Sequence, residues 1–190
     1  MAPAERYEEL LHLIKPDTLK ENLVRAAVYI IAYEFLENLL KDHLENFFGL
    51  MDHDSLRSWD GKGKIKPGKT YAKEVGAKDK DVLIASCRWF EEQNVLTSED
   101  TEFIRTARKH RGDLAHEMPN VLFRGGKQVD ILGLRRICEL AYHLDNWWLV
   151  NMEDAPADTH SLGAMLLRYF TELVNETGSQ DGSSRVPGPM

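Results

Sequence analysis

The chain has 190 residues, 43% hydrophobic and 29% charged, so it can bury one core and has room for a single domain. No stretch approaches the roughly 18–20 consecutive apolar residues that a membrane span requires, and the first residues carry acids where a signal peptide carries cations. The net charge of -7 argues against nucleic-acid binding over the whole surface, and two distant cysteines suggest neither a disulfide framework nor a thiolate metal site. We therefore expect a soluble, cytoplasmic protein that meets any nucleic acid at a local cluster of cations.

Helical periodicity dominates the first quarter of the chain. A short helical pattern over residues 5–14 is ended by Pro16. Asp17 or Thr18 then caps a long helix that is expected to run to about Phe48. The apolar stripe of this helix is wide enough to be buried against several neighbours or against another subunit.

The rest of the chain also predicts helices. Glycines and Pro67 interrupt residues 50–78, which we expect to form a loop. Thr97 and Asp100 have the spacing of a capping box, and the helix that they start is expected to end before Pro119. The helices predicted after the loop span residues 80–94, 97–118, 130–150 and 161–175. With no strand pattern and no internal repeat, the predicted fold is an all-α bundle of about five main helices in one domain, residues 1–177, followed by a disordered tail, residues 178–190.

Residues 63–70, GKIKPGKT, match the letter pattern of a phosphate-binding P-loop, but their context does not. Such a loop needs a buried strand before it and a helix N-terminus after it, and the preceding SLRSWDGK is not an apolar strand. Pro67 also removes one backbone donor that a phosphate cradle would use. We interpret the segment as a basic, flexible loop that is solvated or touches a polyanion.

The most informative stretch is RKHRGDLAHEM, residues 108–118. On a helical wheel at about 100° per residue, Arg111 lies in the middle of the apolar side that is expected to pack. That side also contains Phe103, Ile104, Ala107, Leu114, Ala115 and Met118. The opposite side is cationic and contains Arg105, Arg108, Lys109, Gly112 and His116. A guanidinium on a packed side is unfavourable unless it meets a carboxylate or lines a polar cleft.

Several structural explanations of this stretch are open. Arg111 could form a buried ion pair with a helix carboxylate such as Glu34, with His116 an ordinary surface histidine. Alternatively, Gly112 breaks the helix, Asp113 starts a new turn, and Arg111 turns towards His116 across the kink. The tripeptide Arg-Gly-Asp as an adhesion motif is disfavoured, because such a motif needs an exported protein and an exposed loop.

Arg111-Gly-Asp-Leu-Ala-His116, near the end of a helix in a small all-α protein, resembles the R-x4-6-H signature of HEPN domains. The resemblance extends to the long early helix and to the helix after the motif, so it covers residues 5–175. Many members of that family are metal-independent ribonucleases, often toxins or antiviral effectors, which dimerise so that two such motifs meet in one cleft. The resemblance implies that Arg111 and His116 are the catalytic pair, that RNA is the substrate, and that no metal or other cofactor takes part.

The chain departs from the family pattern at two positions. Members often carry Asn, Asp or His directly after the arginine, whereas this chain has Gly112, with Asp113 one place later in an auxiliary role. The orientation of the catalytic pair therefore stays open. Members that act with a nucleotidyltransferase antitoxin often carry a tyrosine two places after the histidine, where this chain has Met118. Modification at that position is impossible, so an antitoxin of that type is less expected, although an antitoxin protein stays a candidate partner.

Cleavage of RNA through its own 2′-hydroxyl needs a base with a pKa near neutrality, an acid for the leaving oxygen, and positive charge where the phosphorane forms. One His116 cannot easily serve both ends of an in-line displacement, whereas two copies across a dimer axis can. In this mechanism Arg111 holds the phosphate bidentately. The strand is guided by three further cations, Arg105, Arg108 and Lys109. We expect 2′,3′-cyclic phosphate products, activity that survives chelation of metals, and a homodimer of about twice 21.8 kDa.

Two other functions are compatible with the sequence. The histidines show no spacing that is typical of a metal site, so no metal chemistry competes with the ribonuclease hypothesis. The second hypothesis is a non-enzymatic, HEPN-like helical dimer that binds a nucleotide or a protein and uses Arg111 structurally, because a fold resemblance does not settle function. The third is an unrelated helical interaction protein.

Overall fold

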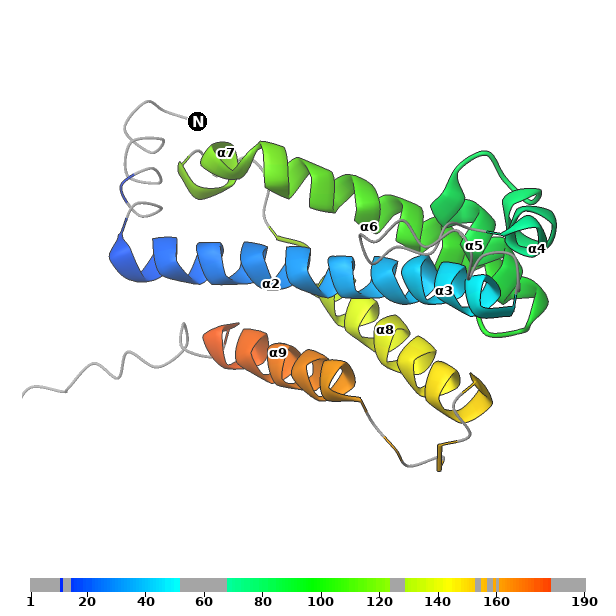
Figure 1. Ribbon diagram of the computed structural model, residues 1–190. Coiled ribbons are helices and arrows are strands. Elements are labelled where there is room, and N and C mark those ends of the chain that lie inside the picture. The colour runs from blue at the N-terminus through cyan, green and yellow to red at the C-terminus, as the bar shows by residue number, and fades with distance from the viewer. Residues whose placement is uncertain are drawn as a thin grey trace, which may run out of the picture.

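The computed structural model describes residues 11, 15–51, 68–123, 129–152, 155–156, 159 and 161–178, and these form an all-α bundle, as predicted (Figure 1). The helices in chain order are α2 (Pro16–Leu40), α3 (Asp42–Met51), α4 (Lys69–Tyr71), the π-helix η2 (Ala72–Gly76), α5 (Val82–Glu92), α6 (Ser98–His116), α7 (Met118–Phe123), α8 (Ile131–Met152) and α9 (Leu162–Gly178). No helix among the described residues combines the length and the apolar character needed to cross a bilayer.

Helix α2 is the centre of the bundle, with α6, α8 and α9 packed around it (Figure 1). Its buried side contributes large side chains that are almost completely inaccessible: Tyr29, Tyr33, Leu36, Leu39 and Leu40. Each such side chain stabilises the fold by about 1.5–3 kcal/mol when it leaves water. Trp148 of α8 also donates its indole N–H to the Leu39 carbonyl at 3.1 Å, which ties α8 to the C-terminal end of α2.

The prediction of one continuous helix up to Phe48 is wrong, because the helix is interrupted at Lys41. Lys41 has φ -102° and ψ -64°, and its N–H still donates to the Glu37 carbonyl at 2.9 Å. The interruption is therefore a bend between α2 and α3 and not a gap in the chain of hydrogen bonds. Beyond the bend, Phe47 and Phe48 join edge-to-face contacts with other rings, including Trp148 and Trp89.

The loop expected over residues 50–78 is also partly wrong, because α4 and η2 form within it. Tyr71 and Val75, four residues apart, are 5% and 0% exposed. Their burial explains why a segment with several breakers is helical, since the packing outweighs the weak local preference. Gly178, the first residue of the predicted tail, is instead the last residue of α9. Residues 52–67, the predicted helix over 5–14 apart from residue 11, and the rest of the predicted tail, 179–190, lie outside the described residues.

The capping box at the start of α6 is confirmed. Thr97 Oγ1 accepts from the Asp100 N–H at 3.2 Å, and Asp100 Oδ2 accepts from the Thr97 N–H at 2.9 Å. Helix α6 then continues through Gly112 to His116, so the alternative in which Gly112 kinks the helix is wrong. Helices α5, α8 and α9 agree with their predicted ranges to within about three residues, which is the usual uncertainty of helix ends.

Candidate functional site

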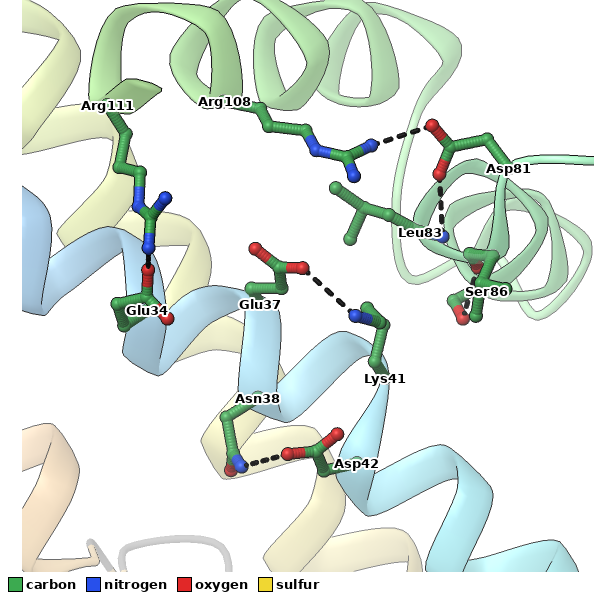
Figure 2. A network of polar contacts seen from close by, with 11 residues as sticks. Glu34, Glu37, Asn38, Lys41, Asp42, Asp81, Leu83, Ser86, Arg108 and Arg111 are labelled. Carbon is green, nitrogen blue, oxygen red and sulfur yellow. Dashed lines mark hydrogen bonds and ion pairs between the residues drawn. The ribbon is translucent and has the colours of Figure 1, made fainter. Parts of the chain in front are cut away.

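Arg111 lies on the side of α6 that faces α2, where its Nη2 donates to Glu34 Oε1 (Figure 2). The expected ion pair with Glu34 is therefore confirmed, but it is not buried. The Arg111 side chain is 35% exposed and the Glu34 side chain 48%. An ion pair this exposed contributes only about 0–1 kcal/mol. The ion pair therefore stabilises the fold too little to explain why an arginine lies beside the packed side chains of α6.

The inner part of the Arg111 side chain reaches a buried polar region between α6 and α2. Among the described residues, neither Arg111 Nε nor the Tyr33 hydroxyl has a hydrogen-bond partner. Burial, with a smaller effect of the Glu37 carboxylate, raises the pKa of the Tyr33 hydroxyl. Tyr33 therefore remains protonated and offers a hydrogen-bond donor near Arg108 and Arg111.

Arg108 does not point away from the bundle as the helical wheel suggests. Its Nη1 donates to Asp81 Oδ2 at 2.6 Å (Figure 2). Asp81 is also the N-cap of α5, where its Oδ1 accepts from the Leu83 N–H at 3.0 Å. Burial opposes ionisation of Asp81, but the hydrogen bond and charge of Arg108 and the backbone donors outweigh it and lower the pKa of the carboxyl below its usual 3.8.

Replacing Asp81 by asparagine should separate its two contacts, because asparagine still caps a helix but carries no charge. We expect the variant to be less stable than the wild type by about 0.3–1 kcal/mol near neutral pH. A carboxyl with a lowered folded pKa stabilises the protein above its unfolded pKa and loses this effect as the pH falls through the folded pKa. The difference should therefore close below about pH 4 in urea denaturation. A difference that persists in acid would contradict the Arg108 contact as its source.

The other cations of α6 lie on its outer side. The Arg105 side chain is 54% exposed, with its Nε 3.5 Å from Glu102 Oε2. Lys109 and His116 are exposed, and neither makes a hydrogen bond or an ion pair with a described residue. Asp113 is half-buried, and its carbonyl accepts from the Glu117 N–H at 2.8 Å at the end of the helix.

Within one chain, Arg111 and His116 do not converge. Residues five apart on a continuous helix point about 140° away from each other, and Arg111 is directed to α2. The wheel is correct for the packed side at Ile104, Ala107 and Leu114, which are buried. It is wrong for Ala115, which is exposed. A site that uses both motif residues on one phosphate therefore needs a second chain.

Exposed apolar side chains lie on the surface of α2, the helix that carries Glu34, and of α9. Phe35 of α2 fills the space that a Cβ on Gly163 of α9 would need, so the two helices lie side by side. We call this surface the α2/α9 apolar face and define it by Leu23, Ile31, Leu162, Met165, Leu166 and Tyr169, which are 48%, 52%, 73%, 58%, 48% and 64% exposed. The sequence-based expectation of a wide stripe on the long helix covers only its α2 part.

The remaining features of the described residues do not extend the site. A shallow groove between α8 and α9, lined by residues that include Arg135, Tyr142 and Arg168, contains none of the motif residues. No three His, Cys, Asp or Glu side chains within the described ranges gather as metal ligands. Comparison with known proteins found no matching family model, no matching curated protein and no matching solved structure.

Proposed function

We propose that this protein is a metal-independent endoribonuclease of the HEPN type, acting as a homodimer on RNA. The observation that carries the proposal is the position of Arg111. Its guanidinium remains 35% exposed, in an ion pair too weak to explain its place in the helix, and its partner Glu34 lies on α2, which contributes to the α2/α9 apolar face. A phosphate can replace Glu34 there, because an arginine holds phosphate and carboxylate with the same bidentate geometry.

The chemistry assigns different tasks to the two motif residues. Arg111 holds the phosphate and stabilises the charge that develops on the phosphorane. His116, exposed at the end of α6, removes the proton from the 2′-hydroxyl or supplies one to the leaving 5′-oxygen. Because one chain directs these residues to different sides, the partner subunit's His116 is required near Arg111.

The α2/α9 apolar face supports self-association. Its six side chains are between 48% and 73% exposed, and apolar side chains that gather on a surface are typical of an interaction site. Charges of both signs lie on the same two helices, with Glu34 on α2 and an Arg168–Glu172 pair on α9 at 3.6 Å. Two identical copies can therefore oppose unlike charges around an apolar centre.

A second candidate is a non-catalytic helical dimer that binds a nucleotide or a protein. The contact of Arg111 with Glu34 favours it, because the arginine already has a partner without any ligand. In this alternative Arg111 only joins α6 to α2, and His116 has no task. The two candidates differ in whether RNA is cleaved and in whether that cleavage depends on His116.

The test is cleavage of fluorogenic single-stranded and structured RNA by the full chain with excess chelator. We expect cleavage, 2′,3′-cyclic phosphate ends, and a mass of about twice 21.8 kDa by light scattering in the same buffer. Ile31→Lys combined with Leu166→Lys should give a monomer that no longer cleaves, since it places charges within the apolar face. The matched control is Val82→Lys, at a 44% exposed apolar residue on α5, which should stay dimeric and active. Absence of cleavage of every RNA, or an active monomer, contradicts the proposal.

A further inference from the structure

Gly112 occupies the interior of α6 without a structural reason for being glycine. Its φ is not in the left-handed region, and a Cβ added to it would meet nothing within 4 Å among the described residues. At Gly133 and Gly163, by contrast, a Cβ would collide with the Asp130 carboxylate or the Phe35 ring. A helix with glycine in its interior is less stable than the same helix with alanine there. Neither backbone conformation nor packing accounts for it here.

The missing side chain leaves an opening in the cationic side of α6. The neighbours of Gly112 on the helix surface are the residues three and four positions away, about 5–6 Å between Cβ atoms. They are Arg108, Lys109, Ala115 and His116, all exposed. We call this opening with its four neighbours the Gly112 notch. Arg108 is held by Asp81, whereas Lys109 and His116 have no polar partner among the described residues.

The notch lies on a straight stripe of basic residues on one side of α6. Arg105, Lys109, Gly112 and His116 follow each other at spacings of four, three and four residues, which keeps them on one side of the helix. The stripe is about 16 Å long, because a helix rises 1.5 Å per residue. An extended polyanion fits this length better than a single phosphate or mononucleotide. Glu102, 3.5 Å from Arg105, is an acid at the far end from His116.

We infer that the Gly112 notch seats a phosphodiester group of the RNA strand beside His116, and that Gly112 is a positioning residue. This inference rests on the proposed ribonuclease function. Without a side chain at residue 112, the phosphate can approach the helix surface between the Lys109 ammonium and the His116 imidazole. A methyl group there would move the phosphate outward by about 1 Å, and displacements of that size reduce rates strongly.

Gly112→Ala and Gly112→Gln test the inference, because stability and activity should move in opposite directions. We expect Gly112→Ala to raise Tm by about 2 °C, as alanine favours the helix and meets no neighbour. The same change should lower kcat/KM on RNA about tenfold, and Gly112→Gln should lower it further. The matched control is Thr106→Ala on another side of α6, where Thr106 Oγ1 donates to the Glu102 carbonyl at 3.1 Å. It also favours the helix but should leave cleavage unchanged.

Binding of a short labelled RNA, measured by fluorescence anisotropy in the His116→Ala background, gives a second readout. The inference predicts weaker RNA binding when Gly112→Gln is added, with the dimer mass unchanged.

The outcomes separate the notch from the ribonuclease proposal. If the wild type cleaves RNA and Gly112→Ala cleaves it equally well, phosphate binding at the notch is contradicted while the ribonuclease proposal stands. If the Gly112 variants lose the dimer and their monomers bind RNA normally, the notch contacts a second copy and the inference is wrong. If RNA binds in a way that depends on Gly112 but is never cleaved, the notch is supported and the ribonuclease proposal is contradicted. If RNA is neither bound nor cleaved, the notch and the ribonuclease proposal are both contradicted.

Discussion

Replacing His116 by alanine is expected to lower kcat/KM for RNA cleavage by about 10²- to 10⁴-fold, the usual contribution of a general acid or base. The imidazole is exposed at the last residue of α6 and has no polar partner among the described residues. Its removal should therefore change the free energy of unfolding by less than about 0.5 kcal/mol. Cleavage of a fluorogenic RNA with chelator, together with urea denaturation of the same samples, measures both quantities.

His43→Ala is the matched control for this loss. His43 is an exposed histidine on α3, and its ring lies 5.9 Å from that of Trp148, away from the motif. The His43 variant should cleave RNA as the wild type does. Equal turnover by the His116 and His43 variants would mean that any observed cleavage comes from another group or from a contaminating nuclease.

Replacing Arg111 by alanine is expected to lower cleavage by about 10²- to 10³-fold, as for other donors that stabilise transition-state charge. The accompanying loss of stability should be no more than about 1 kcal/mol, because the Arg111 and Glu34 side chains are 35% and 48% exposed. Glu34→Gln, which removes the competing carboxylate but keeps the guanidinium, should retain cleavage with an unchanged or lower KM. Steady-state kinetics and chemical denaturation of the two variants check these results.

A charge exchange separates catalysis by Arg111 from a structural role. The double variant Arg111→Glu with Glu34→Arg restores an ion pair between α6 and α2 but moves the guanidinium to the other helix. Under the ribonuclease proposal its stability should recover while its cleavage remains lost. Recovery of both would show that the two residues act only as a structural pair and would contradict catalysis by Arg111. The non-catalytic alternative predicts that stability recovers and that no RNA is cleaved, even by the wild type.

Local patterns predicted most of the helices of this protein. The capping box of Thr97 and Asp100 and the apolar periodicity of α5, α8 and α9 depend on residues within a few positions of each other, so their outcome could be predicted without knowledge of the fold. The Arg111 contact with Glu34 was among the predicted alternatives because a guanidinium on a packed side needs a carboxylate. Its exposure could not be predicted, since it depends on how closely α6 approaches α2.

Features that depend on contacts between residues distant in the sequence could be identified only from the tertiary structure. Burial of Tyr71 and Val75 explains the helix in a segment whose sequence predicts a loop, and Arg108 pairs with Asp81, which is 27 residues away in the sequence. The apolar residues of α9 divide between a buried side and an exposed side only because α2 and α8 cover one of them. Periodicity identifies which residues share one side of a helix. Whether that side is covered depends on where the neighbouring helices pack, and this is a property of the assembled bundle.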